Sequence, residues 1–112
     1  MTVYLYGLVD TDSTDEARSA LTGQPGVAGS AEVAVYEQYS LIWSAHDGGE
    51  ILPRRRLLLA HAQILEKAME FGTVLPMRFG MVSPSLCEFR TLAVQEAHQI
   101  QSAFDLIRGR VE

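Results

Sequence analysis

The sequence predicts an α+β fold of the ferredoxin-like, or split βαβ, kind: a four-stranded antiparallel sheet with two long helices on one face. Two observations support this prediction. The expected elements run strand, short helix, strand, strand, helix, strand, helix, and the first six match that plan. The chain has 112 residues, of which 47% are hydrophobic, and this suffices for one domain with one packed core.

The first strand is expected at Val3–Val9, a run rich in β-branched and aromatic residues that ends at Asp10. Both of its faces are largely apolar, which indicates an interior strand. A short helix over residues 12–21 follows, with Ser13 or Thr14 as N-cap. Residues 22–30 hold three glycines and a proline, so the first crossover is short and rich in loop.

Two strands are expected next, over residues 32–39 and 40–46. In the first, Val33, Val35 and Tyr39 share one face, and in the second Leu41, Trp43 and Ala45 do so. Pro53 then starts a helix that Gly72 ends. Its apolar stripe repeats at helical spacing and includes His61. Three arginines, Arg54–Arg56, stand in its first turn, where they oppose the helix dipole, and the sequence offers no account of them.

The fourth strand is expected over residues 73–82. Alternation puts Arg78 on one face of it and four large apolar side chains on the core face: Leu75, Met77, Phe79 and Met81. A last helix begins after Ser83 or Ser85 and continues to Gly109. The face that carries Arg78 would lie uncovered by helices.

Charge and cysteine content limit the classes of function that the chain could have. The formal net charge of −5 argues against nucleic acid as the main partner. Residues 1–50 carry eight acids and a single base, Arg18, whereas residues 51–112 carry eight bases and six acids. Cys87 is the only cysteine and the chain shows no signal peptide, which fits a cytoplasmic protein. The three histidines show no metal-ligand spacing, and no catalytic set or cofactor fingerprint is present.

Three features rise above this background. His61 is either a core-edge histidine bonded to backbone or a functional group. Arg78 is expected on the open face of the sheet, where Tyr4 and Tyr6 could stack on its guanidinium to form an interface. Arg54–Arg56 form either a solvated helix start or a site for phosphate or an acidic partner.

The segment Val74-Leu-Pro-Met-Arg-Phe-Gly80 closely resembles the signature stretch of the gas vesicle protein GvpF/GvpL family. The family's helical segment of histidine, two residues, two apolar residues and glutamate is matched by His61–Glu66. Tyr4–Val9 is similar to its first strand and residues 106–112 to its mid-chain helix end, although Met81 stands where threonine is common. Ten residues are therefore candidate interaction or motif residues: Tyr4, Tyr6, His61, Glu66, Leu75, Pro76, Met77, Arg78, Phe79 and Gly80.

The resemblance implies an accessory or minor structural protein of gas vesicles, with no enzymatic activity and no cofactor. It implies contacts with the main shell protein or other vesicle proteins, at the gas vesicle in the cytoplasm. It also implies that residues 1–112 are a ferredoxin-like domain at the N-terminal end of a longer, two-domain protein.

Two other readings stay open. One is a small dimeric ligand-binding regulator or enzyme that uses the open sheet face, with a pocket of convergent polar groups beneath it. The other is a phosphate-binding module at Arg54–Arg56, with salt-dependent binding to polyanions.

Overall fold

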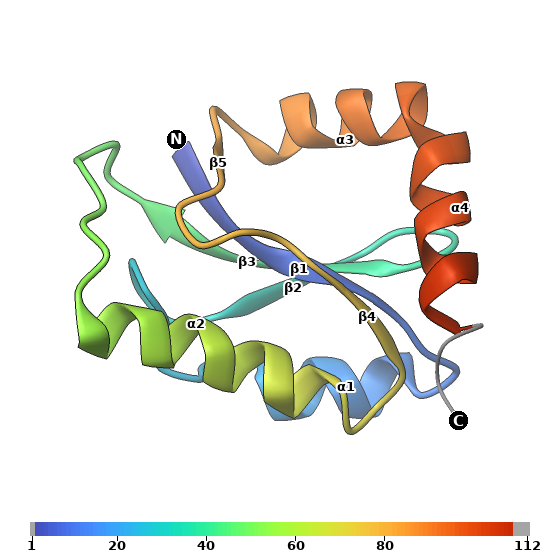
Figure 1. The fold of residues 1–112 in the computed structure, drawn as a ribbon, viewed down its shortest axis with the longest axis horizontal. Coiled ribbons are helices and arrows are strands. Elements are labelled where there is room, and N and C mark those ends of the chain that lie inside the picture. The colour runs from blue at the N-terminus through green and yellow to red at the C-terminus, as the bar shows by residue number, and fades with distance from the viewer. Residues whose placement is uncertain (1, 109–112) are drawn as a thin grey trace.

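The computed structural model describes residues 2–108, which form one sheet and four helices (Figure 1). The strands are β1 (Thr2–Asp10), β2 (Glu32–Val35), β3 (Ser40–His46), β4 (Thr73–Pro76) and β5 (Val82–Ser83). The helices are α1 (Thr14–Leu21), α2 (Arg55–Ala68), α3 (Leu86–Gln95) and α4 (Ala97–Arg108).

The sheet has the ferredoxin-like topology that the sequence predicts. Its strand order is β2-β3-β1-β4, every pair is antiparallel, and β5 pairs with the first part of β1. β1 thus lies in the interior and pairs with three strands, as its two apolar faces indicated. It is buried from Val3 to Val9.

A β-bulge in β1 decides which side chains reach which face. The pairing with β3 shifts between Leu5 and Gly7, so Tyr6 is the extra residue. Before the bulge, Tyr4 and Tyr6 share one face; after it, Leu8 joins the face of Leu5 instead. Strict alternation would have placed Leu8 with the tyrosines. The bulge therefore gives each face its own apolar cluster.

Helices cover both faces of the sheet (Figure 1). α1 and α2 pack on the face of Tyr4 and Tyr6, whereas α3 and α4 pack on the face of Leu5 and Leu8. The expectation that both long helices share one face and leave the other open is wrong. The physical reason is that Tyr4, Tyr6 and Val9 make the face expected to be open as apolar as the face of Leu5 and Leu8, so it too must be buried.

Two predicted elements are divided in the structure. The strand expected over residues 73–82 is interrupted by a turn at residues 77–81, between β4 and β5. The last helix breaks at Glu96, whose backbone leaves the helical region, so α4 can turn toward β4 while α3 stays near β5. The side chain of Ser85 caps α3, as expected, while the predicted helix end at Gly109 lies outside the described residues.

Candidate functional site

The signature segment, residues 74–80, is held from inside by a buried tyrosine–histidine pair. The Tyr4 hydroxyl lies 2.8 Å from Nδ1 of His61, and Nε2 of His61 lies 2.9 Å from the Met77 carbonyl oxygen. Because a carbonyl can only accept, Nε2 carries the proton and Nδ1 accepts from the tyrosine. The Tyr4 oxygen in turn accepts from the Gly80 amide at 3.0 Å. The pair thus fixes both ends of the turn.

Burial keeps both members of this pair neutral. It lowers the pKa of His61, an effect only partly opposed by the hydrogen bond to Met77. It raises the pKa of Tyr4 to about 12, against the opposing hydrogen bond from Gly80. The Phe79 ring closes the cluster, 5.9 Å from the His61 ring and 6.2 Å from that of Tyr4. The arrangement is that of a structural lock.

Tyr6 forms a second lock on the same face, in the crossover loop. Its hydroxyl lies 2.7 Å from Oγ of Ser44 and accepts the Val27 amide at 2.8 Å. Ser44 donates its proton to the carbonyls of Gly29 and Ser30, at 3.2 and 3.0 Å, so Tyr6 is the donor to Ser44. Sequence reasoning missed Ser44 and this loop, although a serine at a position facing the core was the available signal.

The outer side of the signature segment lines an apolar groove. The groove has a volume of about 360 Å³ and opens at the surface between β4 and the helices α3 and α4. Leu75, Pro76 and Met77 form its wall on the strand side, and Phe89, Leu92 and Ile100 face them from the helices. Leu92 is 53% exposed, so the groove is accessible to another molecule. Sequence reasoning missed the groove because it assigned Leu75 and Met77 to a closed core face.

The structure separates the other candidate residues. Arg78 is exposed in the turn, and among residues 2–108 it makes no ion pair or side-chain hydrogen bond. The expected stack on an open sheet face is wrong, because Tyr4 and Tyr6 are fully buried under α2. Glu66 is exposed on α2. Gly80 has φ of +93°, a conformation that favours glycine.

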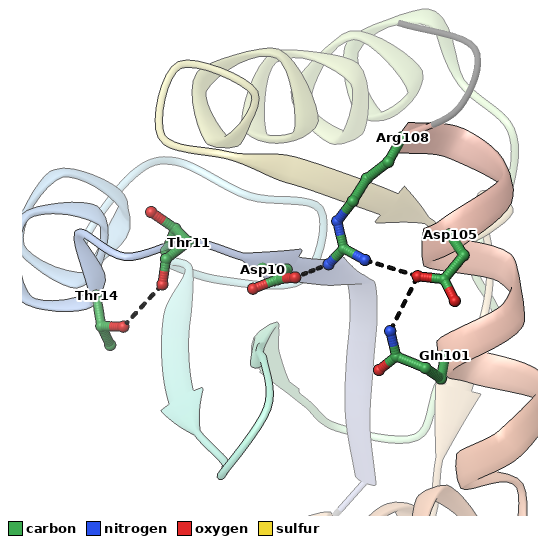
Figure 2. Close-up of polar contacts among 6 residues, drawn as sticks. All are labelled: Asp10, Thr11, Thr14, Gln101, Asp105 and Arg108. Atoms are coloured by element: carbon green, nitrogen blue, oxygen red, sulfur yellow. Dashed lines mark hydrogen bonds and ion pairs between the residues drawn. The ribbon is translucent and has the colours of Figure 1, made fainter.

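A separate polar cluster joins α4 to the end of β1 (Figure 2). The Arg108 guanidinium reaches the Asp10 carboxylate and also pairs with Asp105 at 2.9 Å. Asp105 accepts a further hydrogen bond from Gln101 at 3.1 Å. The Arg108 guanidinium also lies over the Phe104 ring, 5.5 Å from its centroid. This cluster links the C-terminal end of α4 to the end of β1.

Chemical groups for catalysis are not gathered in the part of the chain that the structure describes. Within residues 2–108, no three His, Cys, Asp or Glu side chains come together as a metal-binding group. Cys87 is exposed on α3. None of the helices in the same range is both long and apolar enough to cross a bilayer.

A comparison of the sequence with protein families identifies the family of this chain. A family model described as "Gas vesicle synthesis protein GvpL/GvpF" matches residues 2–112. The chain belongs to the GvpL/GvpF family. The locked turn and the groove are thus the inner and outer sides of the segment that resembles this family's signature.

Individual gas vesicle proteins are also similar to this chain. "Gas vesicle protein F" of Streptomyces sp. (strain CB03234) is 37% identical over 87 residues, which cover 75% of this chain and 34% of that protein. The crystal structure of GvpF from Anabaena sp. PCC7120 has a TM-score of 0.72 and 25% identity, covering 93% of this chain and 44% of that one. GvpF from Microcystis aeruginosa has a TM-score of 0.70 and 27% identity, covering 93% and 43%. The chain therefore spans less than half the length of these relatives.

Proposed function

We propose that this protein acts in gas vesicle assembly, as an accessory or minor structural component, through contacts with the main shell protein or other vesicle proteins. The observation that carries the proposal is the groove. Leu75, Pro76 and Met77, from the segment that resembles the family signature, line it and leave an apolar surface accessible. Apolar surfaces of this kind are typical of protein-binding sites.

The buried side of the same segment supports a binding role over a catalytic one. His61, the strongest candidate for acid–base chemistry, has both ring nitrogens engaged by Tyr4 and Met77. It is 6% exposed, so a substrate could reach it only if the turn opened. The proposal therefore assigns these residues to holding the groove wall in place and attributes no catalysis and no cofactor to the protein.

A pull-down with the main gas vesicle shell protein tests the proposal. The wild-type chain should retain the shell protein, and Leu92→Asp should weaken retention because it places a charge in the groove. Leu106→Asp is the matched control, since Leu106 is 60% exposed on α4 and does not line the groove. The proposal is wrong if the chain retains no shell protein under conditions in which related accessory proteins do.

The alternative of a dimeric regulator or enzyme depended on an open sheet face. α1 and α2 cover that face, which carries Tyr4 and Tyr6, so the premise for a pocket or a dimer there is gone. No second function is therefore proposed for this face.

A further inference from the structure

The outer surface of α2 brings arginines and exposed leucines together. We call this surface the α2 outer face and define it by Arg54, Arg55, Arg56, Leu58, Leu59 and Gln63. Leu58 and Leu59 are 42% and 49% exposed. Arg55, Arg56, Leu59 and Gln63 also line an open hollow of about 630 Å³, which Pro25 and Gly26 of the crossover loop complete. Basic and apolar groups thus share one site.

The arginines are placed where they cost stability. They occupy the start of α2, where positive charge opposes the helix dipole, and the first turn holds no acid to offset them. In the described part of the chain, no acid lies within ion-pairing distance of Arg54, Arg55 or Arg56. Arg18 and Arg108, by contrast, form ion pairs with nearby acids, whereas Arg78, which makes no ion pair within residues 2–108, stands alone in its turn. A local conflict without internal compensation is typical of a functional surface.

The charge of this surface stands out against the rest of the chain. The net charge is −5, and the first fifty residues carry only one base, Arg18. The three arginines, which have no acidic partner within residues 2–108, therefore attract acidic groups locally. The negative charge of the remaining surface repels such groups. The leucines beside them favour a partner that also brings apolar side chains, because such a partner would gain free energy by burying Leu58 and Leu59.

The hollow is already formed in the free protein. Its loop side is fixed because the Tyr6 hydroxyl accepts the Val27 amide, next to Gly26. Its helix side belongs to α2, which the buried His61, Ile64 and Ala68 anchor to the sheet. A partner would therefore bind without paying to order either side.

We propose that the α2 outer face docks an acidic amphipathic helix of another protein. Acidic side chains of that helix would face Arg54–Arg56, and its apolar stripe would cover Leu58 and Leu59. This inference rests on the proposed function, since it assumes a protein that acts through contacts, and it adds a second surface with its own partner chemistry. A polyanion fits less well, because it would leave both leucines exposed.

The test measures binding of three synthetic helical peptides of equal length by isothermal titration calorimetry. The first has leucines at three- and four-residue steps flanked by glutamates. The second has the same composition in scrambled order, and the third has lysine in place of every glutamate. We expect the first peptide to bind, more weakly as salt increases, and the other two to bind at least about tenfold more weakly.

Variants of the protein locate the binding site. The double variant Arg55→Glu/Arg56→Glu and the variant Leu59→Ser should each weaken binding by about tenfold or more. The matched control is Arg18→Glu, which reverses an exposed arginine on α1 and should leave binding unchanged. The double variant should unfold at the same or a higher temperature, because glutamates in the first turn favour the helix dipole, so a loss of binding would not reflect unfolding.

Several outcomes would overturn this inference. These are no binding of the first peptide, equally tight binding of the scrambled peptide or of sodium polyphosphate, or wild-type self-association that the α2 variants abolish. The outcome is separate from that of the proposed function. If Leu92→Asp weakens retention of the shell protein while the peptide fails to bind, the proposed function stands and the α2 outer face is not the docking surface.

Discussion

At the scale of single residues, Tyr4 and Tyr6 each connect the centre of the sheet to a distant segment. Tyr4 reaches His61 and the Gly80 amide, whereas Tyr6 reaches Ser44 and the Val27 amide. All four bonds lie in or beside the core, where an unpaired polar group is costly. The two hydroxyls therefore help to set the position of two loops relative to the sheet.

Replacing Tyr4 by phenylalanine should cost about 1–3 kcal/mol of unfolding free energy, because the ring still packs but Nδ1 of His61 and the Gly80 amide lose their partner. Hydrogen exchange at the Gly80 amide should accelerate while that at Val27 stays protected. Tyr6→Phe is the matched control and should show the reverse pattern. Equal acceleration at both amides in either variant would contradict the assignment of one loop to each tyrosine.

His61 should make stability depend on pH. Burial lowers its pKa in the folded protein below the ordinary value of 6.5, so the unfolded chain takes up a proton at higher pH than the folded protein does. The free energy of unfolding should therefore be fully present above about pH 6.5, fall as the pH drops below it, and level off below the folded pKa. The titratable groups beside the ring are Tyr4 and Tyr6, whose pKa values are raised by burial, so both stay neutral in this range.

Urea unfolding at pH 7.5 and at pH 5 measures this effect. His61→Gln should be less stable at the higher pH and should show a smaller loss between the two values than the wild type. His98→Gln, which replaces an exposed histidine on α4, controls for the change of residue type. An identical pH dependence in the wild type and in His61→Gln would rule out this role for His61.

At the scale of elements, the strength of the local sequence pattern decided how well each was predicted. β1, β3 and α2 were predicted with small errors, since their apolar residues repeat clearly over seven residues or more. The turn within residues 73–82 was not, because the alternation continues through it and only the positive φ of Gly80 marks the break. The kink at Glu96 has no glycine or proline to signal it.

The candidate site was predicted in part for the same reason. His61 was recognised from its place in an apolar stripe, and its bond to the Met77 backbone matches the core-edge interpretation. Tyr4, the hydrogen-bond partner of His61, was instead expected to stack on the guanidinium of Arg78. The bulge at Tyr6 and the packing of α2 on the face of Tyr4 are tertiary features, so no local pattern places Tyr4 under α2.

The crossover loop offers a sharp test at this scale. Gly26→Ala should cost about 1–3 kcal/mol, because a Cβ at residue 26 would overlap the Tyr6 hydroxyl and the Gly29 carbonyl oxygen. Gly29→Ala should have little effect, since the nearest atom to its Cβ would be the Ala45 carbonyl oxygen at 3.7 Å. Thermal unfolding of both variants measures the difference. Equal losses would show that the loop can shift away from Tyr6.

At the scale of the whole molecule, two apolar clusters on opposite faces of one sheet make up the core. The second cluster depends on α3 and α4, which contribute Phe89, Ala93 and Phe104. The ion pair between Arg108 and Asp10 adds little to this packing, because both side chains are about a third exposed to solvent. The attachment of α4 therefore rests mainly on burial of Phe104.

Phe104→Ala should cost about 3–5 kcal/mol, because it leaves a cavity where a 2%-exposed ring fills the second cluster. Leu106→Ala, two residues away on the exposed side of α4, should change stability by less than about 0.5 kcal/mol. Chemical unfolding curves of the two variants give these values. A small loss for Phe104→Ala would mean that α4 is not a required layer of the fold.

The central position of β1 has a consequence for synthesis on the ribosome. β1 is made before any of its three partner strands, and its most extensive partner, β3, begins thirty residues after β1 ends. Its seven consecutive buried residues must therefore wait, unpaired, while the crossover and β2 emerge. β1 is therefore the segment that a ribosome-associated chaperone would meet in this interval, and the sheet can close around it only once β4 and β5 have followed.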